Sequence, residues 1–159
     1  MMCRVNTEHL VNLFEGGITP LIRTDFRDDA AWERLVALVS APVDFGSEGG
    51  DGPGERYTPN VEAISDPAYA GVTGEELGAA WSDRADDAVG YVLLADRQSM
   101  TDADTPTLTY VDLYDEPGRT FRCGPGDVAS VESNLAIANM DFEYFADAVG
   151  ADGVFRTFD

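Results

Sequence analysis

Apolar and polar positions along the chain predict strands and helices in alternation. PLIRTDF (20–26) and NVEAIS (60–65) have the short apolar pattern of strands. VGYVLLAD (89–96) is almost continuously apolar, which is typical of a strand covered on both faces in a parallel sheet. These three strands are therefore predicted to be parallel.

The segments that alternate with these strands have helical periodicity. Residues 28–40 place one apolar stripe on a helix, made of Trp32, Leu35, Val36 and Val39. Thr73 and Glu76 have the spacing of a capping box for a helix that runs through Trp81. Later elements are expected to be helices over 125–140 and 141–150 and a closing strand over 153–158.

These elements predict one α/β (or α+β) domain over residues 1–159. Its mixed β-sheet would contain three parallel strands and a β-hairpin, with helices packed against it. Residues 1–17 are expected to form an N-terminal arm with a short helix. Residues 44–58 are rich in glycine and acid, so they are predicted to be a flexible surface loop rather than a domain boundary.

The stretch YDEPGRTFRCGPG (114–126) is predicted to contain the turn of the hairpin. Pro117 and Gly118 suit the central positions of a type II turn from Glu116 to Arg119. Counting outward, this turn pairs Glu116 with Arg119, Tyr114 with Phe121 and Asp112 with Cys123, and it sets Arg122 diagonal to Asp115. A hairpin with ion pairs is favoured over a phosphate cradle, because a cradle needs a helix N-terminus after the glycine.

The charge of the chain limits its partners. Among 159 residues, 30 are acidic and 10 are basic, which gives a formal net charge of −20. Such a surface repels nucleic acid and anionic membranes and favours a basic protein partner. A salt-adapted cytoplasm and a GC-rich codon bias would each produce this composition.

The residue types present exclude several chemistries. All ten basic residues are arginine, so there is no lysine for a Schiff base or a Walker A motif. His9 is the only histidine, which excludes a histidine-based triad within one chain. No cofactor is expected and no catalytic residue is assigned. The absence of a signal pattern or a long apolar run leads us to expect a cytoplasmic protein.

Four stretches together resemble an uncharacterised family of small acidic domains, found mainly in actinobacteria. They are RTDFRDDAAW, DPAYAG, VDLYDEPGRTFR and NLAIANMDFEYFADAV followed by ADGVFR, and they span residues 19–158. EPGRTFR and the NLxxANMDF pattern are the most specific parts, and the loop at 44–58 departs from the family. The resemblance implies a single domain and brings no activity or site residue with it.

Two hypotheses about function follow. The first, which we favour, is a protein-binding or regulatory module that uses its acidic surface and the region around Asn134, Asn139 and Asp141. Helix capping explains both asparagines equally well.

The second hypothesis is a metal-dependent hydrolase or phosphotransfer enzyme. Asp25, Asp66 and Asp96 each follow one of the three strands that are predicted to be parallel. The carboxyl ends of such strands meet at one crevice, where carboxylates are suited to hold Mg²⁺. Aspartate is also a common turn and cap residue, so the pattern has a purely structural explanation.

Overall fold

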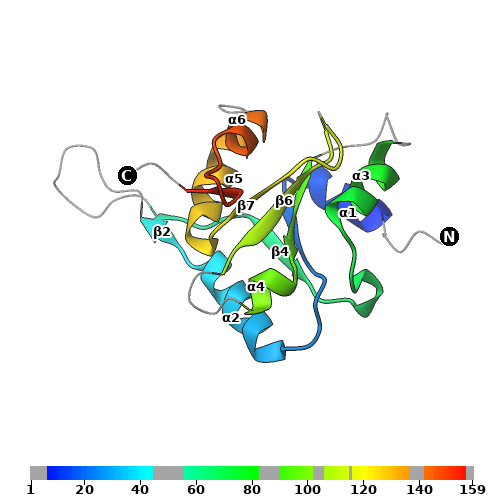
Figure 1. Cartoon of the computed structure of the whole chain (residues 1–159), viewed down its shortest axis with the longest axis horizontal. Helices are drawn as coiled ribbons and strands as arrows, with labels where there is room; N and C mark the ends of the chain where they lie inside the picture. Colours follow the sequence, from blue (N-terminus) through cyan, green and yellow to red (C-terminus); the bar gives the residue numbers. More distant parts are fainter. Residues whose placement is uncertain are drawn as a thin grey trace.

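The protein is a three-layer α/β domain with one mixed sheet between two layers of helices (Figure 1). The computed structural model describes residues 7–44, 56–82, 90–101, 106–114, 116–136 and 142–156. Within them the main sheet has six strands, in the order β4 (Val61–Ile64), β1 (Thr19–Arg23), β5 (Tyr91–Ala95), β6 (Leu108–Asp112), β7 (Thr120–Cys123) and β8 (Val154–Phe155). The predicted fold class is confirmed.

The three predicted parallel strands lie side by side, with β1 between β4 and β5. Leu93 of β5 packs in one apolar cluster and its neighbours Val92 and Leu94 in another, because successive side chains of a strand point to opposite faces. Both faces of β5 are therefore covered, which explains its continuous apolar sequence.

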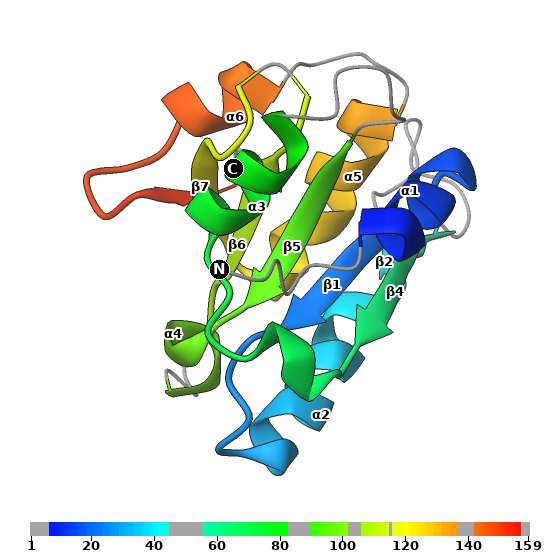
Figure 2. The same cartoon turned by 90° about the vertical axis from the view of Figure 1, so that its right-hand side faces the viewer.

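Helices cover both faces of the sheet (Figure 2). One layer holds α2 (Asp29–Ser40), α5 (Val128–Ala136) and α6 (Phe142–Asp147). The other holds α1 (Thr7–Glu15) and α3 (Gly74–Ser82). Short helices complete the chain as η1 (Pro67–Tyr69), α4 (Arg97–Thr101) and η2 (Pro125–Asp127).

The glycine-rich segment predicted as a loop begins and ends in strands. β2 (Val43–Asp44) pairs antiparallel with β3 (Arg56–Tyr57) in a separate two-stranded sheet. Asp44 pairs with Arg56 and Val43 with Tyr57, so the two ends of this segment lie side by side. Residues 45–55 lie outside the described part.

The hairpin has its predicted turn but a different strand register. The N–H of Arg119 donates to the carbonyl of Glu116 at 2.9 Å, and Gly118 has a φ of 97°. However, Phe121 pairs with Tyr110 and Cys123 with Leu108, so the predicted pairs are wrong by four residues.

Asp112 explains this shift in register. Its carboxylate accepts hydrogen bonds from the backbone N–H groups of Tyr114, at 2.8 Å, and Glu116, at 3.0 Å. An aspartate that binds the following backbone in this way ends the strand at its own position. The turn is thus the tip of a longer loop.

Candidate functional site

A cleft of about 540 Å³ opens at the carboxyl ends of β1 and β5. The chain leaves β1 through α2 to reach β4 on one side, then crosses back through α3 to β5 on the other. In open α/β sheets such a reversal leaves a crevice where ligands bind. The polar side chains that line the cleft are Thr24, Asp25, Thr73, Glu75, Asp96, Arg97, Thr109 and Thr120.

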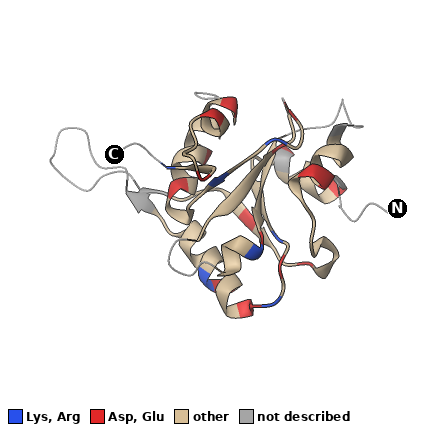
Figure 3. Cartoon of the chain, viewed as in Figure 1, with Lys and Arg blue, Asp and Glu red and all other residues tan. Residues whose placement is uncertain are grey.

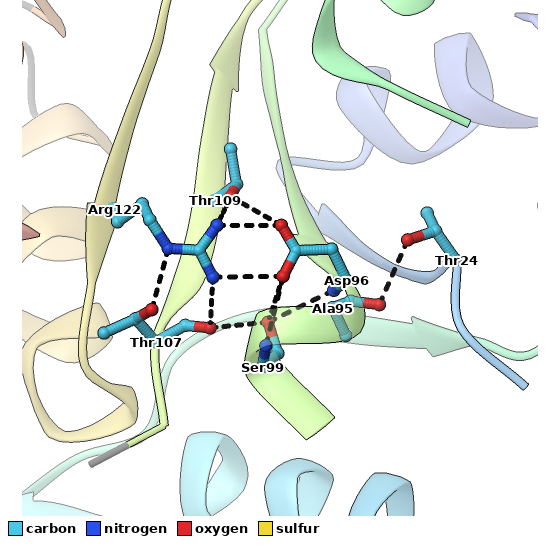
Figure 4. Close-up of polar contacts among 7 residues, drawn as sticks. All are labelled: Thr24, Ala95, Asp96, Ser99, Thr107, Thr109 and Arg122. Atoms are coloured by element: carbon cyan, nitrogen blue, oxygen red, sulfur yellow. Dashed lines mark hydrogen bonds and ion pairs between the residues drawn. The ribbon is translucent and has the colours of Figure 1, made fainter. Parts of the chain in front are cut away.

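One carboxylate of the cleft, Asp96, is fixed by a dense network (Figure 4). The Arg122 guanidinium donates to both of its oxygens, at 2.8 and 3.0 Å. The backbone N–H of Ser99 donates to it at 3.1 Å and the hydroxyl of Thr109 at 3.2 Å. Arg122 also donates to the hydroxyl of Thr107 at 2.7 Å.

This network holds Asp96 in its ionised form. Burial raises the pKa of the carboxyl, but the hydrogen bonds and charge of Arg122, with help from Ser99, outweigh burial and lower the pKa below its ordinary value. Both oxygens already accept from several donors. Asp96 is therefore a structural anchor that ties β5 to β7, with little capacity left for a ligand.

The second carboxylate, Asp25, has a simpler environment. The backbone N–H of Arg27 donates to it at 3.0 Å, and the guanidinium of Arg27 forms an ion pair with it. The side chain of Asp25 is 9% exposed, whereas that of Arg27 is 62% exposed. The hydrogen bonds from Arg27 lower the pKa of Asp25, so the carboxylate is ionised at neutral pH.

The three aspartates of the metal hypothesis do not gather around one point. Asp66 accepts from the N–H of Ala68 at 2.9 Å at the start of η1, and it does not line the cleft. Among the residues that the structure describes, no three side chains of histidine, cysteine, aspartate or glutamate are placed to hold a metal ion. Turn N–H groups and arginines bind these three carboxylates instead.

The two arginines of the hairpin have different partners. Arg119 forms ion pairs with Glu116, at 2.7 Å, and with Asp147 of α6. Arg122 pairs with Asp96, because the observed register turns it toward β5. Asp115 lies outside the described residues.

The predicted binding residues near α5 are only partly placed. The side-chain amide of Asn134 donates to the carbonyl of Ser130 at 2.8 Å, one turn earlier in the same helix. Asn134 is half-buried rather than exposed. Asn139 and Asp141 lie outside the described part of the chain.

The sequence contained a clue to the partners of Arg122. Counting pairs outward from the predicted turn did not find it. Thr107 and Thr109 alternate with the apolar Leu108 and Tyr110, so both threonines share one face of β6. A polar face on a central strand needs a polar partner, and Arg122 on the neighbouring strand is that partner.

These features define a three-layer α/β domain with a polar cleft at the carboxyl ends of its parallel strands. Residues 18–158 match the family described as domain of unknown function DUF6924, and the chain belongs to this family. The resemblance to an uncharacterised family is thus confirmed. No curated protein and no solved structure matches the chain. No helix in the described ranges is long and apolar enough to span a membrane.

Proposed function

We propose that the protein is a binding module that recognises a basic segment of a protein partner in the cleft. The observation that carries this proposal is the net charge of −20 around a cleft whose described lining has three carboxylates, Asp25, Glu75 and Asp96, and one arginine, Arg97. Arg27 and Arg122 pair with Asp25 and Asp96, so Glu75 is the carboxylate of the lining that an incoming cation meets directly. The negative potential of the whole molecule attracts a cation toward the cleft and repels an anion.

The rest of the lining suits a peptide. Four threonines provide hydroxyl groups that both donate and accept hydrogen bonds, and Gly71, Gly74 and Gly118 leave backbone accessible. Val72 and Leu94 add a small apolar surface. Mostly fixed walls with a few polar groups are typical of a recognition site.

The acidity of the whole molecule supports the same partner. Acidic residues occur on most described elements, whereas arginines are few (Figure 3). With a net charge of −20, the protein attracts basic partners over long range and speeds their encounter. The cleft then supplies the short-range contacts.

The lining does not favour a catalytic alternative. Among the described residues that line the cleft there is no histidine, cysteine or lysine, so their titratable groups are carboxylates and one guanidinium. Asp96 is held by Arg122, and Asp25 is held by Arg27. We therefore propose no reaction.

Peptide binding tests this function. A short fluorescent peptide with arginines among glycines and serines should bind saturably at about 1 M monovalent salt, which screens diffuse attraction. The same peptide with glutamates in place of arginines should not bind.

Two neighbouring glutamates give a matched pair of variants. Glu75 lines the cleft, whereas the adjacent Glu76 does not. Both are exposed in the first turn of α3. Glu75→Gln should weaken the binding of the arginine peptide about two- to fivefold, and Glu76→Gln should leave its affinity unchanged. Equal effects of the two variants, or equal binding of both peptides, would contradict the proposed function.

A further inference from the structure

The two ionised carboxylates of the cleft differ in how firmly their cations are held. Asp96 is bound by Arg122, which is 17% exposed and is itself tied to Thr107 and Thr109. Asp25 is bound by Arg27, which is 62% exposed and donates its side-chain hydrogen bonds to Asp25. The cation on Asp96 is part of the framework, whereas the cation on Asp25 is mostly exposed to solvent.

The geometry at Asp25 is that of guanidinium recognition. The Nε of Arg27 lies 3.1 and 3.2 Å from the two carboxylate oxygens, and its Nη2 also contacts one of them. The Nε–Nη2 edge of the guanidinium, with its two N–H donors, faces the two oxygens of the carboxylate, and lysine cannot reproduce this arrangement.

We propose that Asp25 is the anchor that receives an arginine side chain of the partner, and that Arg27 occupies this position within the free protein. This inference rests on the proposed function and names the group that the cleft recognises. The incoming arginine takes the place of Arg27, whose side chain then turns to solvent. No covalent change is involved.

The environment of Asp25 favours such an exchange. Its side chain is almost buried, so an ion pair there is less screened than one on the open surface. Arg27 is already 62% exposed, so water hydrates its side chain on release, and the incoming arginine restores the ion pair that Arg27 gives up.

The test uses the intact chain and the blocked peptide Ac-Gly-Arg-Gly-NH₂, followed by NMR titration at about 1 M salt. Its isosteric partner is the same peptide with citrulline, which keeps the shape of arginine and lacks its charge. In the wild-type protein the Nε–H signal of Arg27 should shift as the arginine peptide binds, and the citrulline peptide should cause no such change.

Two variants measure the competition. Arg27→Ala removes the internal occupant, so the peptide should bind about two- to fivefold more tightly. Asp25→Asn removes the anchor, so binding should weaken at least about tenfold. Arg156→Ala is the matched control, because Arg156 is 63% exposed and pairs with Asp152, which does not line the cleft. It changes the net charge by the same amount as Arg27→Ala and should leave the affinity unchanged apart from that charge.

The outcomes separate this inference from the proposed function. If the peptide binds in the cleft and Asp25→Asn binds it as tightly as wild type, or Arg27→Ala gains no more affinity than Arg156→Ala, the assignment of the anchor is wrong and the binding function stands. If arginine peptides produce no saturable shifts at cleft residues, both fail. If Asp25→Asn does not fold, its NMR spectrum will lose chemical-shift dispersion. Arg27→Ala then still tests the same competition between Arg27 and the peptide.

Discussion

At the residue scale, Glu132 of α5 is a carboxyl group buried in the apolar layer. It is 4% exposed and accepts hydrogen bonds from the hydroxyl of Thr19, at 2.8 Å, and from that of Tyr110, at 2.7 Å. Burial raises its pKa above the ordinary value, although the two hydroxyl donors lower it in part. This group joins β1, β6 and α5 and makes the stability of the fold depend on pH.

The sign of that dependence follows from the raised pKa. Between the ordinary carboxyl value of 4.5 and the raised value, the folded state binds more protons than the unfolded state. The free energy of unfolding contributed by Glu132 therefore falls as the pH rises through this window. Glu132→Gln has no proton to lose and keeps the shape of the side chain.

We accordingly expect Glu132→Gln to gain stability relative to wild type as the pH rises from about 4 to 7. Urea unfolding across this range measures it. Glu143→Gln, at an exposed position of α6, serves as the control and should show no comparable trend. A difference between Glu132→Gln and wild type that is constant with pH would contradict this account.

A second residue-scale prediction concerns the ion pair of the cleft. Asp96→Asn leaves the guanidinium of Arg122 without its carboxylate in a site where that guanidinium is 17% exposed. We expect the free energy of unfolding to fall by about 1–3 kcal/mol. Asp152→Asn removes the carboxylate from an exposed pair with Arg156 and should have little effect. Similar losses in the two variants would show that Asp96 is not a structural anchor.

At the residue scale, part of the candidate site could be predicted from the sequence. The positions of Asp25 and Asp96 at the ends of predicted strands placed both of them in the cleft. Their partners were not predictable in the same way. Arg122 meets Asp96 only through the register of β6 with β7, and that register depends on the backbone contacts of Asp112.

At the scale of elements, the strands and helices were largely readable from periodicity. The continuous apolar run of β5 indicated a central strand, and the Thr73 hydroxyl does accept from the N–H of Glu76, at 3.1 Å, at the start of α3. The packing of α3 against the hairpin loop could not be predicted from the sequence pattern. It depends on the close approach of Gly74 and Gly78 to β7 and the loop, which periodicity does not report.

Gly78→Ala tests this close approach. A Cβ at residue 78 would lie 2.5 Å from the Cα of Gly118, which is backbone that cannot move aside cheaply. We expect a loss of about 1–3 kcal/mol in the free energy of unfolding, although alanine favours a helix over glycine by about 1 kcal/mol. Gly126→Ala, where a Cβ meets nothing within 4 Å, should be nearly neutral. A stabilised Gly78→Ala variant would show that α3 does not touch the loop.

At the scale of the whole molecule, composition predicts a single acidic domain and a partner of positive charge. It does not identify that partner. The acidic residues behind the net charge of −20 are spread along the whole sequence, and those of the described part lie on several helices, strands and loops (Figure 3). Like charges repel one another in the compact state, and salt screens this repulsion.

We therefore expect the melting temperature to rise between low and molar monovalent salt, by about 2–4 °C for each kcal/mol of repulsion relieved. Calorimetry at a fixed pH measures it, and potassium and sodium chloride should act alike because screening is not specific. A melting temperature indifferent to salt would mean that the repulsion is neutralised locally by pairs such as Arg119 with Glu116.

The central claim is that the cleft, rather than the acidic surface as a whole, recognises a basic partner. The most direct measurement is NMR chemical-shift mapping of the short arginine peptide on the ¹⁵N-labelled protein at about 1 M salt. The account predicts saturable shifts concentrated at the cleft, at Thr24, Thr73, Thr109 and Thr120. Shifts spread over distant acidic sites such as Asp147 and Asp152, or shifts that do not saturate, would contradict it.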